Sequence, residues 1–96
     1  GDFALDGAVL ARYAGTYQET EGTKQTLVLS VEGPALRAVL SGPPLALGAI
    51  DAATFRPLGF PRFVTLTVKT SGERVEGITV KDGRSRRWFA REEARP

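Results

Sequence analysis

Cysteine and histidine are both absent from this chain of 96 residues. Without cysteine, neither a disulfide nor a thiolate metal site can supplement the hydrophobic core. Without histidine, the chain lacks the commonest general base and the commonest zinc ligand. These two absences exclude much of enzyme chemistry from the chain itself.

Long apolar segments and a strong charge of one sign are also missing. No run of about eighteen apolar residues is present that would cross a membrane as a helix, and the opening GDFALDG lacks the basic start and apolar centre of a signal peptide. The net charge is only +2, a small excess that indicates no particular class of partner. We expect residues 1–96 to form a single domain, excised from a larger protein.

A short amphipathic segment opens the chain. Asp6 stands at a helix N-cap position, and Val9, Leu10 and Tyr13 fall on one face of the helix before a glycine ends it. This pattern predicts a short helix over residues 6–14.

From residue 16 to residue 91 the apolar residues recur with a period of two, which is typical of β-strands. The clearest example is RFVTLTVKT, in which Val64, Leu66 and Val68 alternate with threonines. Turns that contain glycine or proline divide this region into eight short strands. In RVEGITVK the alternation changes phase at Glu76 and Gly77, which predicts a β-bulge.

No helix-length segment separates these strands, so βαβ crossovers are excluded. Eight strands with one apolar face each can pack as two sheets or close into a ring, and only closure removes the exposed edges. We therefore predict an all-β fold, an eight-stranded antiparallel up-and-down barrel whose short N-terminal helix covers one open end. The predicted inward side chains are Leu27, Leu29, Val31, Leu36, Ala38, Leu40, Leu45, Leu47, Phe55, Val64, Leu66, Val68, Val75, Ile78, Val80 and Phe89.

The order of several short motifs is similar to that of a known family. The motifs are Leu5-Asp6, the run from Leu10 to Tyr17, Leu36, the turn Ser41-Gly42-Pro43, Leu47, Phe55, Leu66, Gly72, Val75, Gly77-Ile78 and Phe89-Ala90-Arg91. Together they resemble the lipocalin-like domain attached C-terminally to β-lactamase-related serine hydrolases. The resemblance covers about Leu5 to Arg91. It implies a lipocalin-like barrel that follows a catalytic domain of the penicillin-recognising fold, in a secreted, periplasmic or cell-envelope protein.

The family's catalytic residues belong to that other domain, and none can be carried over to this chain. No Ser-x-x-Lys motif occurs here, and the Gly-x-Trp signature of true lipocalins is missing near the first strand. The resemblance therefore implies a non-catalytic accessory domain, which packs on the catalytic domain of the same polypeptide or on a second copy. We expect no cofactor and no metal, because the carboxylates fall mostly in turns or on polar strand faces without ligand spacing.

The segment RSRRWFAR contains the most distinctive surface pattern. Alternation places Trp88 and Arg86 on the face opposite to Phe89, and Arg84 precedes them in the turn. If Phe89 points inward, these three residues form a candidate protein interface, in which tryptophan and arginine are enriched. One alternative is a structural tryptophan that lies under the helix or a loop. The other is a nucleic-acid stacking platform, which no second basic and aromatic strand supports.

A small hydrophobic ligand inside the barrel is the alternative function. An eight-stranded barrel holds either side chains alone or one small molecule. The almost wholly apolar inward set favours a filled core. If a ligand does bind, the polar groups expected near it at the barrel ends are Tyr13, Tyr17, Arg87 and Arg91, with Gln25 as a further candidate.

Overall fold

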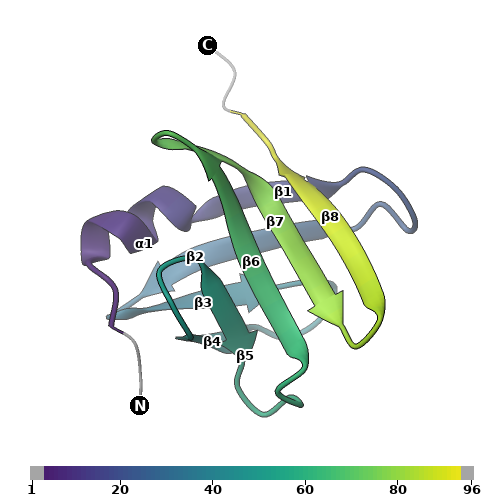
Figure 1. Cartoon of the computed structure of the whole chain (residues 1–96), viewed down its shortest axis with the longest axis horizontal. Helices are drawn as coiled ribbons and strands as arrows, with labels where there is room; N and C mark the ends of the chain where they lie inside the picture. The colour runs from purple at the N-terminus through teal and green to yellow at the C-terminus, as the bar shows by residue number, and fades with distance from the viewer. Residues whose placement is uncertain (1–3, 94–96) are drawn as a thin grey trace.

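The computed structural model describes residues 4–93 and confirms the predicted all-β barrel. Each strand pairs with the next one in an antiparallel sense, and β8 pairs back with β1, so the sheet has no open edge (Figure 1). Gly1, where we expect excision from a longer protein, lies outside the described residues. The elements are α1 (Gly7–Tyr13), β1 (Gly15–Glu19), β2 (Thr26–Glu32), β3 (Ala35–Val39), β4 (Leu45–Ala49), β5 (Thr54–Pro57), β6 (Val64–Ser71), β7 (Arg74–Asp82) and β8 (Ser85–Arg91).

The helix α1 covers one end of the barrel, as predicted. Asp6 caps it, since its Oδ1 accepts a hydrogen bond from the backbone N–H of Ala8 at 3.2 Å. Leu10 and Tyr13 are buried, and Val9 packs against the same core from a half-buried position. The apolar stripe read from the sequence is therefore the face that closes the barrel.

The core runs through the middle of the barrel and up to the helix. Most of the predicted inward side chains are buried there or pack against it. Val31 is an exception, because its exposed fraction is 43%. The last pair between β1 and β2 joins Gly15 to Leu29, so Val31 extends past the end of β1 and has no strand beside it on that side. The largest fully buried side chains are Tyr17, Phe55, Phe89, Leu27, Leu36 and Ile78.

The predicted β-bulge is present in β7. Lys69 pairs with Gly77 while Thr70 pairs with Val75, so Glu76 is the extra residue. Because of this insertion, Val75 and Ile78 both face inward and both are buried, although they are three positions apart.

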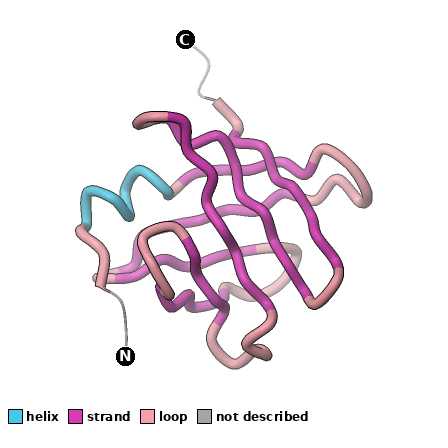
Figure 2. Tube along the Cα trace, viewed as in Figure 1, coloured by secondary structure: helices cyan, strands magenta, loops and turns pink. Residues whose placement is uncertain are grey.

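Because consecutive strands are antiparallel, the connecting loops alternate between two ends (Figure 2). We call the end with α1 the helix end; the loops β2–β3, β4–β5 and β6–β7 also lie there. We call the other end the open end, and it is formed by the loops β1–β2, β3–β4, β5–β6 and β7–β8. Among the described residues, no helix lies at the open end.

Candidate functional site

A cavity of about 250 Å³ lies at the open end, and we call it the open-end cavity. Ten of its thirteen lining residues are apolar. The three polar ones, Asp82, Ser85 and Arg87, all come from the β7–β8 hairpin and form one wall. The expectation of a filled core is therefore wrong at this end. Side chains such as Leu40 and Val80 line a space here that no helix or strand of residues 4–93 covers.

Arg87 points into the barrel and forms an ion pair with Glu19 from β1. Its Nε donates to Glu19 Oε2 at 2.7 Å and its Nη2 donates to Glu19 Oε1 at 2.8 Å. Nη2 also donates to Gln25 Oε1 at 2.6 Å, and the guanidinium lies 5.1 Å from the centre of the Phe89 ring. Such a two-pronged pair fixes both side chains. It therefore joins the β1–β2 hairpin to β8 beside the cavity.

The pair keeps Glu19 ionised. The side-chain hydrogen bonds from Arg87 lower the pKa of Glu19 from its usual 4.5 to about 2, although burial acts in the opposite direction. The backbone N–H of Gln25 and the hydroxyl of Thr23 donate to the same carboxylate and contribute to this lowered pKa. The positive charge of Arg87 is thus balanced at short range by Glu19, so Arg87 adds little net charge to this wall of the cavity.

Glu19 is an exception to the expectation that the carboxylates fall mostly in turns or on polar strand faces. Its exposed fraction is 6%. A signal was present in the sequence, because Glu19 is in phase with Tyr17 along β1 and Arg87 is in phase with Phe89 along β8. Applying the alternation to the charged residues would have placed both inside the barrel.

Arg91 lies at the opposite end of β8 and holds the helix. Its Nη1 donates to Tyr17 Oη at 2.9 Å and to the backbone oxygen of Arg12 at 2.8 Å, while Nη2 donates to the backbone oxygen of Ala14 at 3.0 Å. A cation at the C-terminal carbonyls of a helix is favourable. The close approach also explains Gly15, because a Cβ there would lie 3.0 Å from the guanidinium carbon.

The two tyrosines complete the helix end. Tyr17 Oη donates to the backbone oxygen of Tyr13 at 2.5 Å, and Tyr13 Oη donates to the backbone oxygen of Ala52 at 2.8 Å. Burial raises the pKa of Tyr17. Of the four residues predicted to lie near a ligand, Tyr13, Tyr17 and Arg91 gather here as supports of α1. Only Arg87 lines the open-end cavity.

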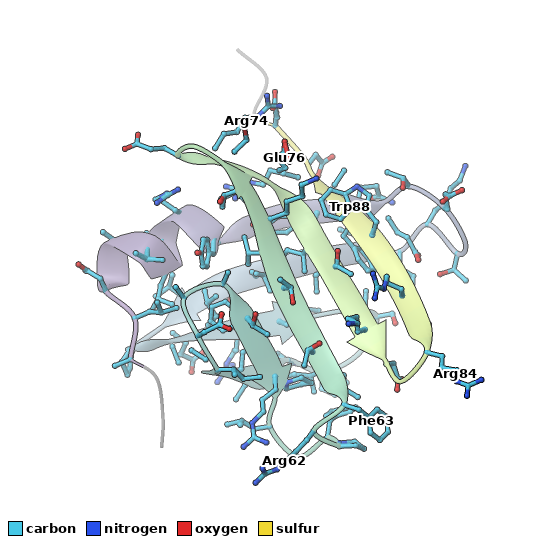
Figure 3. The ribbon with its side chains drawn as sticks, in the orientation of Figure 1. Arg62, Phe63, Arg74, Glu76, Arg84 and Trp88 are labelled. Atoms are coloured by element: carbon cyan, nitrogen blue, oxygen red, sulfur yellow. The ribbon has the colours of Figure 1, made fainter. Side chains whose placement is uncertain are left out.

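Trp88 faces outward, as its phase relative to Phe89 predicts, but it also has a structural contact. A Cβ added to Gly77 would lie 2.5 Å from the Cζ2 and Cη2 atoms of Trp88, so the indole ring covers that glycine. Arg86 lies on the same strand face, opposite Lys81. Figure 3 shows Trp88 on the outer surface of the barrel and Arg84 apart from it, at the β7–β8 turn.

A second hollow, of about 650 Å³, lies at the helix end. Its charged lining is already bonded within the protein, since Arg12 Nη2 donates to the backbone oxygen of Glu73 at 2.8 Å and Arg74 pairs with Glu93. A third hollow, of about 330 Å³ beside Leu5, Leu10 and Phe55, has no polar side chain in its lining. We therefore take the open-end cavity, which combines an apolar lining with polar groups, as the candidate site.

Within residues 4–93 no group of three or more carboxylates is arranged to hold a metal ion. In the same range, no helix is long and apolar enough to cross a membrane.

The fold defines the class of this protein as an eight-stranded up-and-down β-barrel of lipocalin-like architecture. No protein-family model matches the chain, and no curated protein matches it. The relation to β-lactamase-related serine hydrolases stays a prediction from the sequence motifs.

Proposed function

We propose that this chain is a non-catalytic binding barrel that holds a small apolar molecule in the open-end cavity. The observation that carries the proposal is an apolar hollow with polar groups on one wall only, at the end of the barrel where the described part of the chain forms no helix. Ligand sites commonly combine an apolar lining, which drives binding, with a few polar groups that orient the ligand.

The size and polarity of the cavity restrict the ligand. Its 250 Å³ falls below the range of about 300 to 1,000 Å³ that is usual for ligand pockets. Asp82 disfavours an anionic group, and the charge of Arg87 is balanced by Glu19. These features favour a small neutral molecule with one hydroxyl or amide directed at Ser85 and its neighbours.

Fluorescence titration with the neutral dye N-phenyl-1-naphthylamine, followed by displacement with 1-decanol, tests this proposal. Ala38 lines the cavity and is buried, so Ala38→Leu fills the space and is expected to abolish the dye signal. Ala46→Leu is the matched control, because Ala46 is exposed on the outer face of the neighbouring strand. Equal dye binding by the two variants would rule out the cavity as the site.

A second candidate is the accessory role that the sequence motifs imply. The observation that favours it is the outward Trp88 beside Arg86, the residue types that concentrate at protein interfaces. In this case the barrel packs on the catalytic domain of a β-lactamase-related hydrolase or on a second copy of itself.

A test of the accessory role requires variants that leave the fold intact. Removing the Trp88 ring would uncover Gly77, so Trp88→Phe and Arg86→Glu are better choices than alanine at Trp88. Binding to the catalytic domain encoded in the same gene is measured by titration calorimetry, and self-association by analytical ultracentrifugation. We expect Arg86→Glu to weaken one of these interactions; unchanged values in both assays would remove this surface from consideration.

A further inference from the structure

The loop between β5 and β6 exposes large apolar side chains at the open end. Phe60 and Phe63 are 48% and 59% exposed, and Phe60 also lines the mouth of the open-end cavity. A single exposed apolar side chain is ordinary, but two exposed aromatic rings within four residues of one loop indicate an interaction surface.

Two arginines accompany these rings. Arg62 lies between them in the sequence, and Arg84 lies in the β7–β8 turn, next to Gly83, whose added Cβ would stand 4.0 Å from Phe63 Cδ1. Figure 3 shows Arg62, Phe63 and Arg84 along the lower edge of the barrel, with Phe63 between the two arginines, which point outward in different directions. Within the described part of the chain, neither arginine forms an ion pair. We call Phe60, Arg62, Phe63 and Arg84 the basic–aromatic rim.

Charge is distributed unequally between the two ends. Among residues 4–93, the loops and strand ends of the open end carry Lys24, Arg62 and Arg84 against Glu21 and Asp82. In the same range, the helix end carries more carboxylates than arginines: Asp6, Glu32, Asp51, Glu73, Glu92 and Glu93 against Arg12, Arg37, Arg74 and Arg91. An anionic surface therefore attracts the rim and repels the opposite end, which orients the barrel with its cavity toward that surface.

We infer that the basic–aromatic rim docks on a lipid surface with anionic headgroups. Phe60 and Phe63 enter the interfacial layer, while Arg62 and Arg84 contact phosphate groups, to which the planar guanidinium is well matched. The rings stand on an exposed loop, of which Phe60 also lines the open-end cavity, rather than on a flat face. A fluid headgroup layer can close around such side chains, whereas a rigid protein surface would meet only their tips.

This inference does not depend on a ligand in the cavity, although docking would place the cavity mouth against the lipid. It is tested by co-sedimentation of the protein with two kinds of vesicle, phosphatidylcholine alone and equal parts phosphatidylcholine and phosphatidylglycerol. We expect binding only to the second kind and a loss of binding as salt is raised, because surface charges are screened.

The test compares substitutions in the basic–aromatic rim with control substitutions at the helix end. The double variant Arg62→Glu with Arg84→Glu is expected to lower the vesicle partition coefficient roughly tenfold or more, and Phe63→Ser is expected to lower it severalfold. Arg74→Glu and Ile50→Ser are the controls, because both residues are exposed at the helix end. These controls should bind at least as well as the unmodified protein.

Three outcomes would overturn the inference: equal binding to both kinds of vesicle, equal losses in rim and control variants, or no binding at all. A change of oligomeric state on mutation of the rim, without a change in vesicle binding, would assign the rim to a protein partner instead. Ala38→Leu should leave vesicle binding intact, and the double arginine variant should leave dye binding intact. Failure of this inference is therefore separable from failure of the proposed ligand site.

Discussion

The two ends of this barrel are built from the same eight strands but finish in different ways. At the helix end, Leu10 and Tyr13 cover the core, and Arg91 bonds the end of the helix to β8. At the open end, no helix is present among the described residues, and a cavity with an apolar lining remains under an exposed aromatic loop. The comparison shows that the strands alone do not complete the core. The helix buries part of the lining at its own end, although an apolar hollow of about 330 Å³ beside Leu5 and Leu10 remains there.

The largest expected difference between the ends comes from the same substitution made at each. Leu10→Ala removes a side chain that is 2% exposed and should lower the free energy of unfolding by about 3 kcal/mol. Leu40→Ala, at the half-buried wall of the open-end cavity, should cost only about 1 kcal/mol, because the leucine side chain is already partly exposed to solvent. Urea denaturation followed by circular dichroism measures both values. Equal losses would mean that the two ends are packed alike.

Arg91→Met should produce the next largest effect, about 2 kcal/mol of lost stability. The substitution keeps most of the side-chain length but removes the hydrogen bonds to Tyr17 and to the helix carbonyls. Hydrogen exchange should show α1 opening more often while β6 and β7 stay protected. Uniformly faster exchange would contradict the idea that Arg91 acts on the helix end alone.

Because of the Glu19–Arg87 pair at the open end, the stability of the folded protein depends on pH. The pKa of Glu19 is about 2 in the folded protein, below its usual 4.5, so the folded state binds fewer protons between these values. The contribution of the pair is complete above pH 4.5 and declines as the pH falls toward 2. Glu19→Gln should therefore flatten the fall of stability in acid.

Asp51 is the helix-end control for the dependence of stability on pH. The pKa of Asp51 is also lowered, chiefly by a hydrogen bond from the backbone N–H of Ala53. Asp51→Asn keeps an oxygen for that bond and should remove a smaller part of the acid dependence. A larger change in Asp51→Asn than in Glu19→Gln would show that the main acid-sensitive contact lies at the helix end.

The smallest expected effects on stability belong to the rim. Phe63→Ser and Arg62→Ser replace exposed side chains, so each should change the free energy of unfolding by less than about 0.5 kcal/mol. Thermal denaturation of these variants also provides the folding control for the vesicle experiment. A clear loss of stability would indicate that Phe63 packs against the β7–β8 turn more than its exposure implies.

The strands were predictable from the sequence because their signals are local. Alternation along RFVTLTVKT predicts which residues face inward, and the change of phase at Glu76 predicts the bulge that the structure shows. The stripe with Leu10 predicts a helix that covers a barrel end. The candidate site was predictable only in part. Arg87 was among the expected polar residues, whereas its partner Glu19 was not.

By itself, therefore, the sequence determined the helix, the strands, the bulge and most of the inward faces, because each depends on residues a few positions apart. Only the tertiary structure decided that Glu19 pairs with Arg87, that Trp88 covers Gly77, and that Val31 extends past the end of β1. It also decided that α1 covers one end, and that a cavity with both apolar and polar lining lies at the end where the described residues form no helix. These outcomes depend on the register between strands and on where each strand stops, which bring together residues that are far apart along the chain.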